Sequence, residues 1–351
     1  MIKYQYRKNA RTYMQISTLI TNVALLFIMM LPGVILKKCN MCSDSFGKGL
    51  SNLVLYIAQP ALIVCAYIDC RLSLSEIWRD ALAVLALSVV AHLLFSVVAL
   101  SLFHRAPKDT AKMLRFVTIF SNAAFLGIPL IQAVFDTRPE MAIYASIYNI
   151  TFNLFLWTLG VLLCTHEKGD DLDCDGDSDA ADLAIRAKRE VSLFKVLLHP
   201  VTLASAIGIA LLALGINSEV IGGAGLGIIS DALHMVSGLV APLSMTVIGL
   251  RLADISLKGF FSDAHMYLFL ALRHLVLPLA LLGLIKLSQL AGIPIGGDTV
   301  TVVMLLASTP AASSATMFAE KYNCDAKYVS RLVTVSTILS IATMPLVIAL
   351  I

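Results

Sequence analysis

Charged residues are scarce in this chain of 351 residues. Asp, Glu, Lys and Arg make up only 14% of it, whereas a soluble globular protein carries about 25%. Hydrophobic residues make up 58%, and the mean hydropathy is +0.85. A water-soluble fold cannot bury so much apolar surface, so the solvent of this protein is a lipid bilayer. The composition therefore excludes a cytosolic enzyme, a nucleic-acid-binding protein and a disordered chain.

The common signatures of catalytic and metal sites are also missing. The seven cysteines are an odd number and show no secreted disulfide framework. Cys39 and Cys42 form a single pair without a second pair or a histidine beside it, which does not favour a zinc or redox site. His166-Glu167 is not followed by the second histidine of a zinc protease helix, and no phosphate-binding loop is present. We expect no enzyme activity, no metal and no cofactor.

Ten apolar runs are each long enough to cross about 30 Å of hydrocarbon as a helix. They cover residues 14–36, 47–67, 81–103, 114–135, 140–164, 194–216, 229–250, 264–287, 299–319 and 328–351. We therefore predict an all-α integral membrane protein with ten transmembrane helices. Four glycines interrupt the pattern at 217–230, which favours a re-entrant or interfacial segment before the seventh span.

The basic residues orient these spans. Seventeen of the 26 Lys and Arg lie in the odd-numbered connections, and eight lie in the N-terminal arm and the even-numbered connections. Basic connections face the cytoplasm, so we predict a multi-pass protein of the cell inner (plasma) membrane with both termini outside. The basic N-terminal arm argues for the opposite orientation.

The one long hydrophilic connection, 165–193, divides the chain into two sets of five spans, 1–164 and 194–351. We predict that it is a cytoplasmic acidic linker. The acidic residues from Asp171 to Asp182 also follow the spacing of a calcium-binding loop. The linker interpretation is the stronger one, because Ser178 stands at the apolar position of such a loop and cytosolic calcium is scarce.

Two pairs of prolines suggest that the halves are copies of each other. Pro60 and Pro242, in the second and seventh spans, are 182 positions apart, and Pro129 and Pro310, in the fourth and ninth, are 181 apart. A unit of five spans is odd in number, so its second copy must cross the membrane in the opposite sense. Inverted repeats of this kind are typical of secondary transporters.

The fourth and ninth spans each place a proline among small, hydroxyl and amide side chains. A broken helix exposes backbone groups at membrane depth, and these must face protein or a wet cavity. The N-terminal ends of the half-helices carry partial positive charge and open donors, which would suit an anion if the two breaks meet. The candidate binding residues are Ser121, Asn122, Gly127, Pro129, Ser308, Thr309, Pro310, Ser313 and Ser314. For each hydroxyl alone, bonding within its own helix is the ordinary alternative.

Other polar residues lie inside the spans. Asn149 and Asn153 are one helical turn apart in the fifth span, and they either line the cavity or tie the fifth span to the fourth. His92 is a candidate for proton coupling, against the ordinary alternative of a satisfied buried imidazole. Arg273, next to His274, is expected to reach toward the cytoplasmic interface.

Three stretches resemble the auxin efflux carrier family, the plant PIN-formed carriers and their bacterial malate-permease-like relatives. They are Ser121-Asn122 through Gly127, Pro129 and Leu130; Ser308 through Pro310 to Ser314, continuing to Phe318, Glu320 and Tyr322; and Ser336, Thr337, Leu339, Ser340 and Pro345. The resemblance implies two inverted five-helix repeats in which spans 4 and 9 cross at their breaks. It implies a transport core from spans 3–5 and 8–10, and a scaffold and homodimer interface from spans 1, 2, 6 and 7. It also implies that Asn122 contacts the anionic substrate.

The sequence thus predicts a secondary carrier, or permease, that moves a small organic anion across the bilayer by alternating access. This chain has Asn122-Ala123 where the plant carriers have an Asn-Thr run, so a carboxylate such as malate is a better candidate than auxin. We expect backbone dipoles and amides, rather than a buried cation, to hold it. A sodium-coupled symporter of related fold, an anion channel and a membrane sensor remain as alternatives.

Overall fold

The computed structural model of the protein describes residues 21–43, 45–165, 197–253, 263–322 and 324–351. These residues are helical, and the one β-type contact among them is an isolated bridge between Ser121 and Ala311. The predicted acidic linker, with its calcium-like spacing from Asp171 to Asp182, lies outside the described residues.

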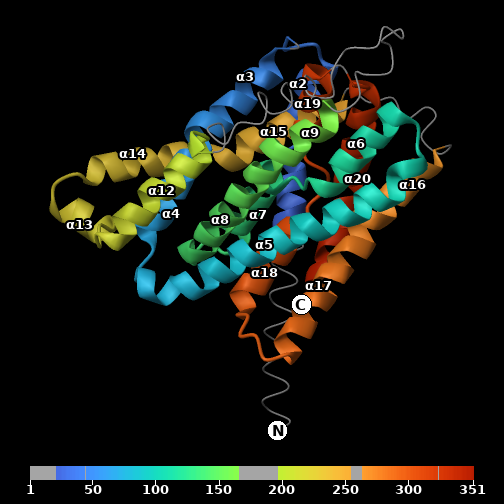
Figure 1. Cartoon of the computed structure of the whole chain (residues 1–351). Helices are drawn as coiled ribbons and strands as arrows, with labels where there is room; N and C mark the ends of the chain where they lie inside the picture. The colour runs from blue at the N-terminus through green and yellow to red at the C-terminus, as the bar shows by residue number, and fades with distance from the viewer. Residues whose placement is uncertain (1–20, 44, 166–196, 254–262, 323) are drawn as a thin grey trace, which may run out of the picture.

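The helices lie at different angles around a shared interior (Figure 1). In chain order the α-helices are α2 (Leu31–Lys38), α3 (Phe46–Leu53), α4 (Gln59–Asp69), α5 (Leu74–Leu102), α6 (Lys108–Ile119), α7 (Ile128–Val134), α8 (Pro139–Phe155), α9 (Val161–Thr165), α12 (Pro200–Ala213), α13 (Ser218–Gly223), α14 (Gly227–Ser237), α15 (Val240–Ala253), α16 (Ala264–Ala271), α17 (Leu277–Leu290), α18 (Gly297–Ala307), α19 (Ser314–Lys321) and α20 (Ala326–Ala349). Four π-helical segments, η1 (Val54–Ala58), η3 (Ala123–Gly127), η4 (Leu156–Gly160) and η6 (Leu272–Val276), and the 3₁₀ helix η2 (Phe103–Arg105) join some of them.

Seven helical segments of the described chain are long and apolar enough to cross a membrane. They are Thr21–Lys38, Phe46–Asp69, Leu74–Leu102, Pro139–Cys164, Gly227–Ala253, Ala264–Leu290 and Ala326–Val347. Three shorter apolar helices, Ala123–Val134, Pro200–Ala213 and Gly297–Ala307, fall in the other predicted runs. The prediction of a multi-pass helical membrane protein is therefore confirmed. The third segment begins seven residues before its predicted start, where the Ser73 N–H donates to Glu76 Oε2 at 2.7 Å and caps the helix.

Three of the π-helical segments lead into an α-helix whose second residue is proline. Pro60 follows η1, Pro129 follows η3 and Pro278 follows η6. Proline has no N–H to donate, and its ring crowds the carbonyl group four residues earlier, so the turn before it cannot keep regular α-helical bonding. The wider π turn absorbs this mismatch without ending the helix.

The most extensive contacts between the halves of the chain are those of α2 with α15 and of α4 with α12. Both contacts are close because glycines lie in them. A Cβ atom on Gly249 would lie 2.0 Å from the Met30 carbonyl oxygen, and one on Gly33 would lie 2.1 Å from a carbonyl oxygen of α15. A Cβ atom on Gly208 would lie 2.1 Å from the Tyr67 ring. Small residues that let helix backbones approach are the usual basis of helix association in membranes.

A second group of helices surrounds the two interrupted segments, which are α6–η3–α7 in the fourth predicted span and α18–α19 in the ninth. Helix α5 packs on α6, α8 and α18, and α20 packs on α18, α19 and η6. Figure 1 shows α6, α16, α17 and α20 on one side of the molecule, α4, α12, α13 and α14 on the other, and α5 running across between them. The interrupted segments therefore lie between α15 and this second group.

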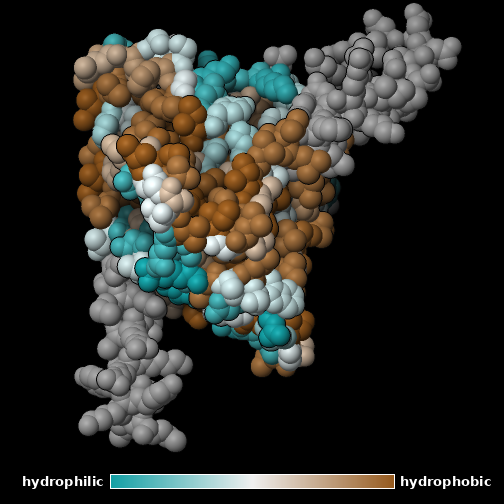
Figure 2. All heavy atoms as spheres, turned by 90° about the vertical axis from the view of Figure 1, so that its left-hand side faces the viewer, coloured by the Kyte–Doolittle hydropathy of each residue, from teal (hydrophilic) through white to brown (hydrophobic). Residues whose placement is uncertain are grey.

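The glycine-rich stretch at 217–230 forms α13, a turn at Gly225 (φ +75°) and the start of α14. Helix α13 contains no buried residue and packs on α14, so this stretch fits the interfacial alternative better than the re-entrant one. On the face formed by these helices, apolar residues cover the middle and hydrophilic residues gather toward the two ends (Figure 2). That distribution is the one expected for a surface that meets lipid tails between two layers of headgroups.

The α2–α15 contact yields a stability prediction. Gly249→Ala forces a methyl group against the Met30 backbone, which cannot move without shifting a helix, so we expect a loss of about 1–3 kcal/mol. Gly283→Ala is the matched control, because a Cβ atom there meets nothing within 4 Å. Thermal unfolding in detergent should show a lowered Tm for Gly249→Ala and an unchanged or raised Tm for Gly283→Ala. Equal Tm values for the two variants would contradict the packing described.

Candidate functional site

The two interrupted segments meet at their breaks. Helix α6 ends at Ile119 and η3 begins at Ala123, whereas α18 ends at Ala307 and α19 begins at Ser314. In the gaps, the Asn122 N–H donates to the Pro310 carbonyl at 2.7 Å and the Ala312 N–H donates to the Phe120 carbonyl at 2.9 Å. Each break thus satisfies freed backbone groups of the other, as backbone inside a bilayer requires.

We call the meeting point of the two breaks the crossing. Side chains add further hydrogen bonds to it. The Asn122 amide nitrogen donates to Ser313 Oγ at 2.9 Å, which links the two breaks a second time. The Ala311 N–H donates to Ser336 Oγ of α20 at 2.9 Å, and His274 Nε2 lies 2.8 Å from the same hydroxyl. Asn122 and Ser313 are both buried. The predicted meeting of Asn122 with the hydroxyl cluster of the ninth span is therefore present.

Several predicted site residues have other partners. Ser308 and Thr309 bond to carbonyl groups of their own helix, the ordinary alternative for a buried hydroxyl. Asn153 lies 3.5 Å from His199 Nδ1 at the start of α12, so it ties the fifth span to the sixth and not to the fourth. Both amide atoms of the buried Asn149 have no hydrogen-bond partner among the described residues. The same holds for the Ser121 hydroxyl, although the Ser121 backbone forms the bridge to Ala311.

The two paired prolines do not occupy equivalent places. Pro310 lies inside its break and accepts a hydrogen bond from Asn122. Pro129 lies beyond η3, as the second residue of α7. Gly127 shapes the crossing more directly, because a Cβ atom there would lie 2.5 Å from Leu306 Cδ2 and 3.4 Å from Thr309 Cγ2. Ser314 is the first residue of α19 and is partly exposed.

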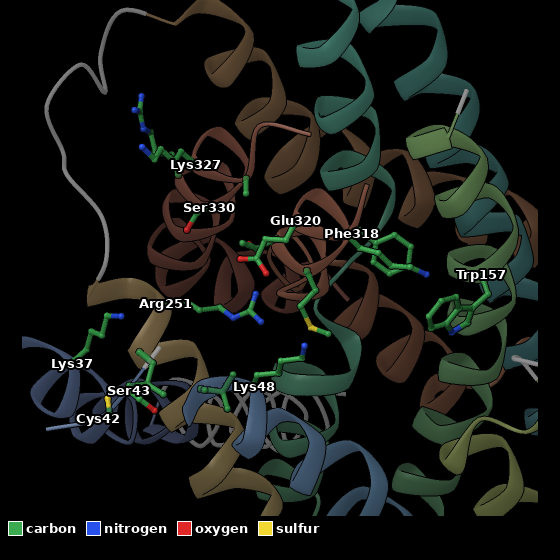
Figure 3. Close-up of a pocket in the computed structure, with 18 residues that line it drawn as sticks. Lys37, Cys42, Ser43, Lys48, Trp157, Arg251, Phe318, Glu320, Lys327 and Ser330 are labelled. Atoms are coloured by element: carbon green, nitrogen blue, oxygen red, sulfur yellow. The ribbon is translucent and has the colours of Figure 1, made fainter. Parts of the chain in front are cut away.

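A cavity of about 900 Å³ lies beside the crossing. Its walls come from α3, α15, α19 and α20, the end of α2 and Trp157. Six of its lining residues are cationic, namely Lys37, Lys48, Arg251, Lys321, Lys327 and Arg331, and Glu320 is the one acidic residue among the described lining. In Figure 3, Arg251, Lys48 and Glu320 point into the same space. An excess of five positive charges concentrates anions in such a recess.

Arg251 connects this cavity to the crossing. It lies in the last turn of α15, and its guanidinium donates to the Ser313 carbonyl, while the Ser313 hydroxyl is bonded to Asn122. From the sequence alone, Arg251 looked like an ordinary basic residue at the end of a span. The signal that could have singled it out is its place near the end of the seventh span, one of the four spans that contain the paired prolines.

The predicted place of Arg273 is wrong. Arg273 lies in the middle of Ala264–Leu290, its side chain is 0% exposed, and it does not reach an interface. Its guanidinium donates to backbone carbonyl groups of the two interrupted segments. The expectation that backbone dipoles and amides, rather than a buried cation, hold the substrate stays a prediction, and the structure places two arginines, Arg251 and Arg273, beside the crossing.

The opposite end of the molecule is closed by polar contacts. Arg138, just before α8, binds Asp298 at the start of α18 through two nitrogens, and lies 2.8 Å from Glu140. The hydrogen bond to Asp298 is the main cause that raises the pKa of Arg138. Thr299 donates to Asp80 of α5 at 2.7 Å. Within the described residues, the crossing is thus approached by a cavity from one end and tied by ion pairs at the other.

Comparison with known proteins agrees with this architecture. A family model described as "Membrane transport protein" matches residues 18–348. The chain belongs to this family. The match confirms the resemblance to auxin efflux carriers, and it shows that the protein is a transporter of the membrane.

A relative named "Uncharacterized transporter", from Methanothermobacter thermautotrophicus, is 26% identical over 321 residues. The match covers 91% of this chain and 94% of the relative. It supports the assignment to the membrane transport family over nearly the whole length.

His92, the candidate for proton coupling, is enclosed by aromatic rings. Its ring centroid lies 5.0 Å from that of Phe155 and 5.5 Å from that of Tyr148, and its Nδ1 lies 2.7 Å from the Ser88 carbonyl oxygen. Nδ1 therefore donates to this oxygen within its own helix, which is the ordinary alternative for a buried imidazole, and proton coupling by His92 stays a prediction. Among the described residues, no group of three His, Cys, Asp or Glu side chains is placed to hold a metal ion.

The contact of Gly127 with Leu306 yields a test of the crossing. Gly127→Ala should cost about 1–3 kcal/mol by overpacking, and Leu306→Ala should cost about 2–5 kcal/mol by leaving a cavity. In the double variant the new methyl group occupies part of the space left by the Leu306 side chain. We therefore expect the double variant to lose about 0.5–3 kcal/mol less stability than the sum of the two single variants. Thermal unfolding of the four proteins in detergent measures it. Leu305, which is equally buried, serves as the control partner, and its substitution should be additive with Gly127→Ala. Additivity with Leu306→Ala as well would contradict the crossing geometry.

Proposed function

We propose that this membrane transport protein is a secondary carrier that moves a small organic anion, such as malate, by alternating access. The observation that supports it best is the cationic cavity whose Arg251 reaches the crossing of the two broken helices. A carboxylate entering the cavity meets the excess of positive charge first. It then meets the N-terminal ends of η3 and α19, whose partial positive charges favour an anion.

The charge of the cavity favours a dicarboxylate over a monocarboxylate. Desolvating a second carboxylate is costly, and a site offsets that cost only with charge-assisted hydrogen bonds. Arg251 and Lys48 point into one space and together provide donors for two carboxylate groups. Glu320 in the same space disfavours a third negative charge.

We infer that the fold consists of two inverted five-helix repeats, 1–164 and 194–351, joined by the cytoplasmic linker 165–193. The reciprocal helix pairs support this arrangement, because the first span of each half (α2, α12) packs on the second span of the other (α15, α4). The two backbone hydrogen bonds of the crossing are reciprocal in the same way. The proline spacing is weaker support, since Pro129 and Pro310 stand differently relative to the breaks.

We further propose that the cavity faces the cytoplasm. Its walls are built from the ends of spans that adjoin odd-numbered connections, and these connections hold seventeen of the 26 basic residues. This orientation places both termini outside, in the cell membrane. The protein would then be open to the inside, with Arg138 and Asp298 closing the outer end. Spans 1, 2, 6 and 7 are the proposed scaffold and homodimer interface.

Arg251 gives the site a means of responding to substrate. Its helix packs on α2 and α3, whereas Ser313 belongs to the break that packs with the opposite group of helices. An anion that takes over the donors of Arg251 removes a link between these two groups. Alternating access requires one group to move against the other.

Transport assays distinguish this carrier from a channel or a sensor. Purified protein in liposomes should take up radiolabelled malate with saturation, and unlabelled malate inside should accelerate uptake. A channel would show no such acceleration, and a sensor would bind without transport. A thermal-shift screen of dicarboxylates against monocarboxylates of similar size identifies the substrate class.

The charge of Arg251 should control substrate affinity. Arg251→Gln keeps a donor for the Ser313 carbonyl but removes the positive charge. The charge-assisted hydrogen bond to the substrate is then lost, and its contribution of about 1.5–3 kcal/mol corresponds to a KM raised roughly 10- to 100-fold. Arg71→Gln is the matched control, since the Arg71 side chain is 88% exposed and lies outside the cavity lining. Uptake rates should also fall with ionic strength in the wild type. An unchanged KM in Arg251→Gln would count against the cavity as the entry route.

Asn122 should be needed for transport but not for folding. Asn122→Ala removes one hydrogen bond, worth about 1 kcal/mol of stability, so the Tm should change little while uptake in proteoliposomes is lost. Asn217→Ala, at the exposed start of α13, is the control and should transport normally. Wild-type rates in Asn122→Ala would refute its role in binding.

A further inference from the structure

Arg273 is a buried cation whose hydrogen bonds are all with backbone carbonyl groups. It is the largest fully buried side chain of the described chain. Its Nη1 donates to the Thr118 carbonyl at 3.1 Å, its Nη2 to the Ala307 and Thr309 carbonyls at 2.9 and 2.8 Å, and its Nε to Thr309 at 3.2 Å. No carboxylate among the described residues lies within salt-bridge distance of it, and its carbon Cζ lies 5.4 Å from the Phe95 ring centroid.

The carbonyl groups that it contacts belong to one structural feature. Thr118 is in the last turn of α6, Ala307 is the last residue of α18, and Thr309 lies just beyond it. Each C-terminal end of a helix carries roughly −0.5 elementary charge, so two such ends carry about −1 together. The guanidinium supplies +1 at the same place. The two helix ends thus form a carbonyl cluster that takes the place of a counter-ion for Arg273.

A cluster of unwound backbone carbonyl groups and half-helix C-terminal ends at membrane depth is the kind of site that binds a coupling cation in secondary transporters. In this protein, a side chain fills the cluster. We propose that Arg273 is a built-in cation that replaces a coupling ion at the crossing, so that anion transport proceeds without sodium at this cluster. The inference rests on the proposed anion-transport function, and it decides against the sodium-coupled alternative.

The position of Arg273 within its span supports this role. It lies in η6, the π-helical segment before Pro278, and its side chain contacts Phe95 of α5, Thr118 of α6 and Ala307 of α18. A lysine could not serve equally, because one ammonium group is a single point of charge whereas the planar guanidinium has five N–H donors in a fixed fork. Four hydrogen bonds to three carbonyl groups use that geometry.

The first experiment uses the wild-type protein. Malate uptake into proteoliposomes is measured in sodium chloride and in choline chloride at equal ionic strength, and the Tm of the detergent-purified protein is measured in the same two salts. We expect equal uptake rates and equal Tm values. Uptake that is lost in choline, or a Tm several degrees higher in sodium, would overturn the proposal while leaving anion transport intact. A lack of uptake in both salts would instead count against the proposed function, and the Tm comparison would still test Arg273.

The second experiment empties the carbonyl cluster. Arg273→Ala should lower the Tm, and low millimolar methylguanidinium should restore part of the loss, because that ion carries the missing group. Choline at the same concentration should not restore it, and neither ion should raise the Tm of the wild type. Gly283→Ala, a change in the same span, is the control and should not respond. A variant whose Tm does not respond to methylguanidinium would contradict the cation-site interpretation. If Arg273→Ala does not fold, Arg273→Lys replaces it and should show a Tm below that of the wild type with no response to methylguanidinium, because one ammonium group fills the cluster but makes fewer of its hydrogen bonds. A wild-type Tm in Arg273→Lys would contradict the proposal.

Discussion

The structure depends on how two broken helices satisfy their backbone groups inside a membrane. A break in a transmembrane helix leaves several N–H and C=O groups without partners, and each costs several kcal/mol in hydrocarbon. Here the two breaks pair with each other through Asn122, Pro310, Phe120 and Ala312, and Ser336 binds one further N–H group. The carbonyl groups of Thr118, Ala307 and Thr309 accept from Arg273, and that of Ser313 accepts from Arg251. The crossing is thus stabilised by donors and acceptors from three other spans, those of Arg251, Arg273 and Ser336.

In this arrangement of the described residues, the negative helix ends at the crossing are neutralised, whereas the positive helix ends are not. The C-terminal ends of α6 and α18 are neutralised by Arg273, whereas the N-terminal ends of η3 and α19 have no acidic partner in the described structure. The cavity adds Arg251 and the surrounding lysines on one side. An anion near the crossing therefore experiences positive potential from helix ends and side chains alike, while a cation meets a cluster that is already filled. The proposed selectivity for anions rests on backbone geometry and two arginines acting together.

Much of this fold could be predicted from the sequence, because hydrophobic length and proline placement are local signals. The ten apolar runs and the two interrupted spans follow from them, whereas the meeting of the two breaks is implied by the resemblance to the auxin efflux carriers. Arg273 could not be placed, since its partners are carbonyl groups of two other spans, and a carbonyl group has no sequence signature. The proline spacing also does not reveal that the two breaks differ: Pro310 lies within its break, whereas Pro129 follows a π turn.

The remaining polar residues show why composition alone cannot separate binding from structure. Ser308, Thr309 and Asn122 look equally suited to a substrate in the sequence, yet two of them bond to their own helix and one bonds across the crossing. What distinguishes them is the direction of the side chain relative to the break. A hydroxyl that precedes a break still has helix carbonyls behind it, whereas a side chain that follows a break faces the other segment. Residues directly after a break are therefore better candidates for binding than residues directly before it. By that reasoning we propose that substrate binding and protein motion are coupled at Asn122 and Ser313, with Arg251 between Ser313 and the cavity.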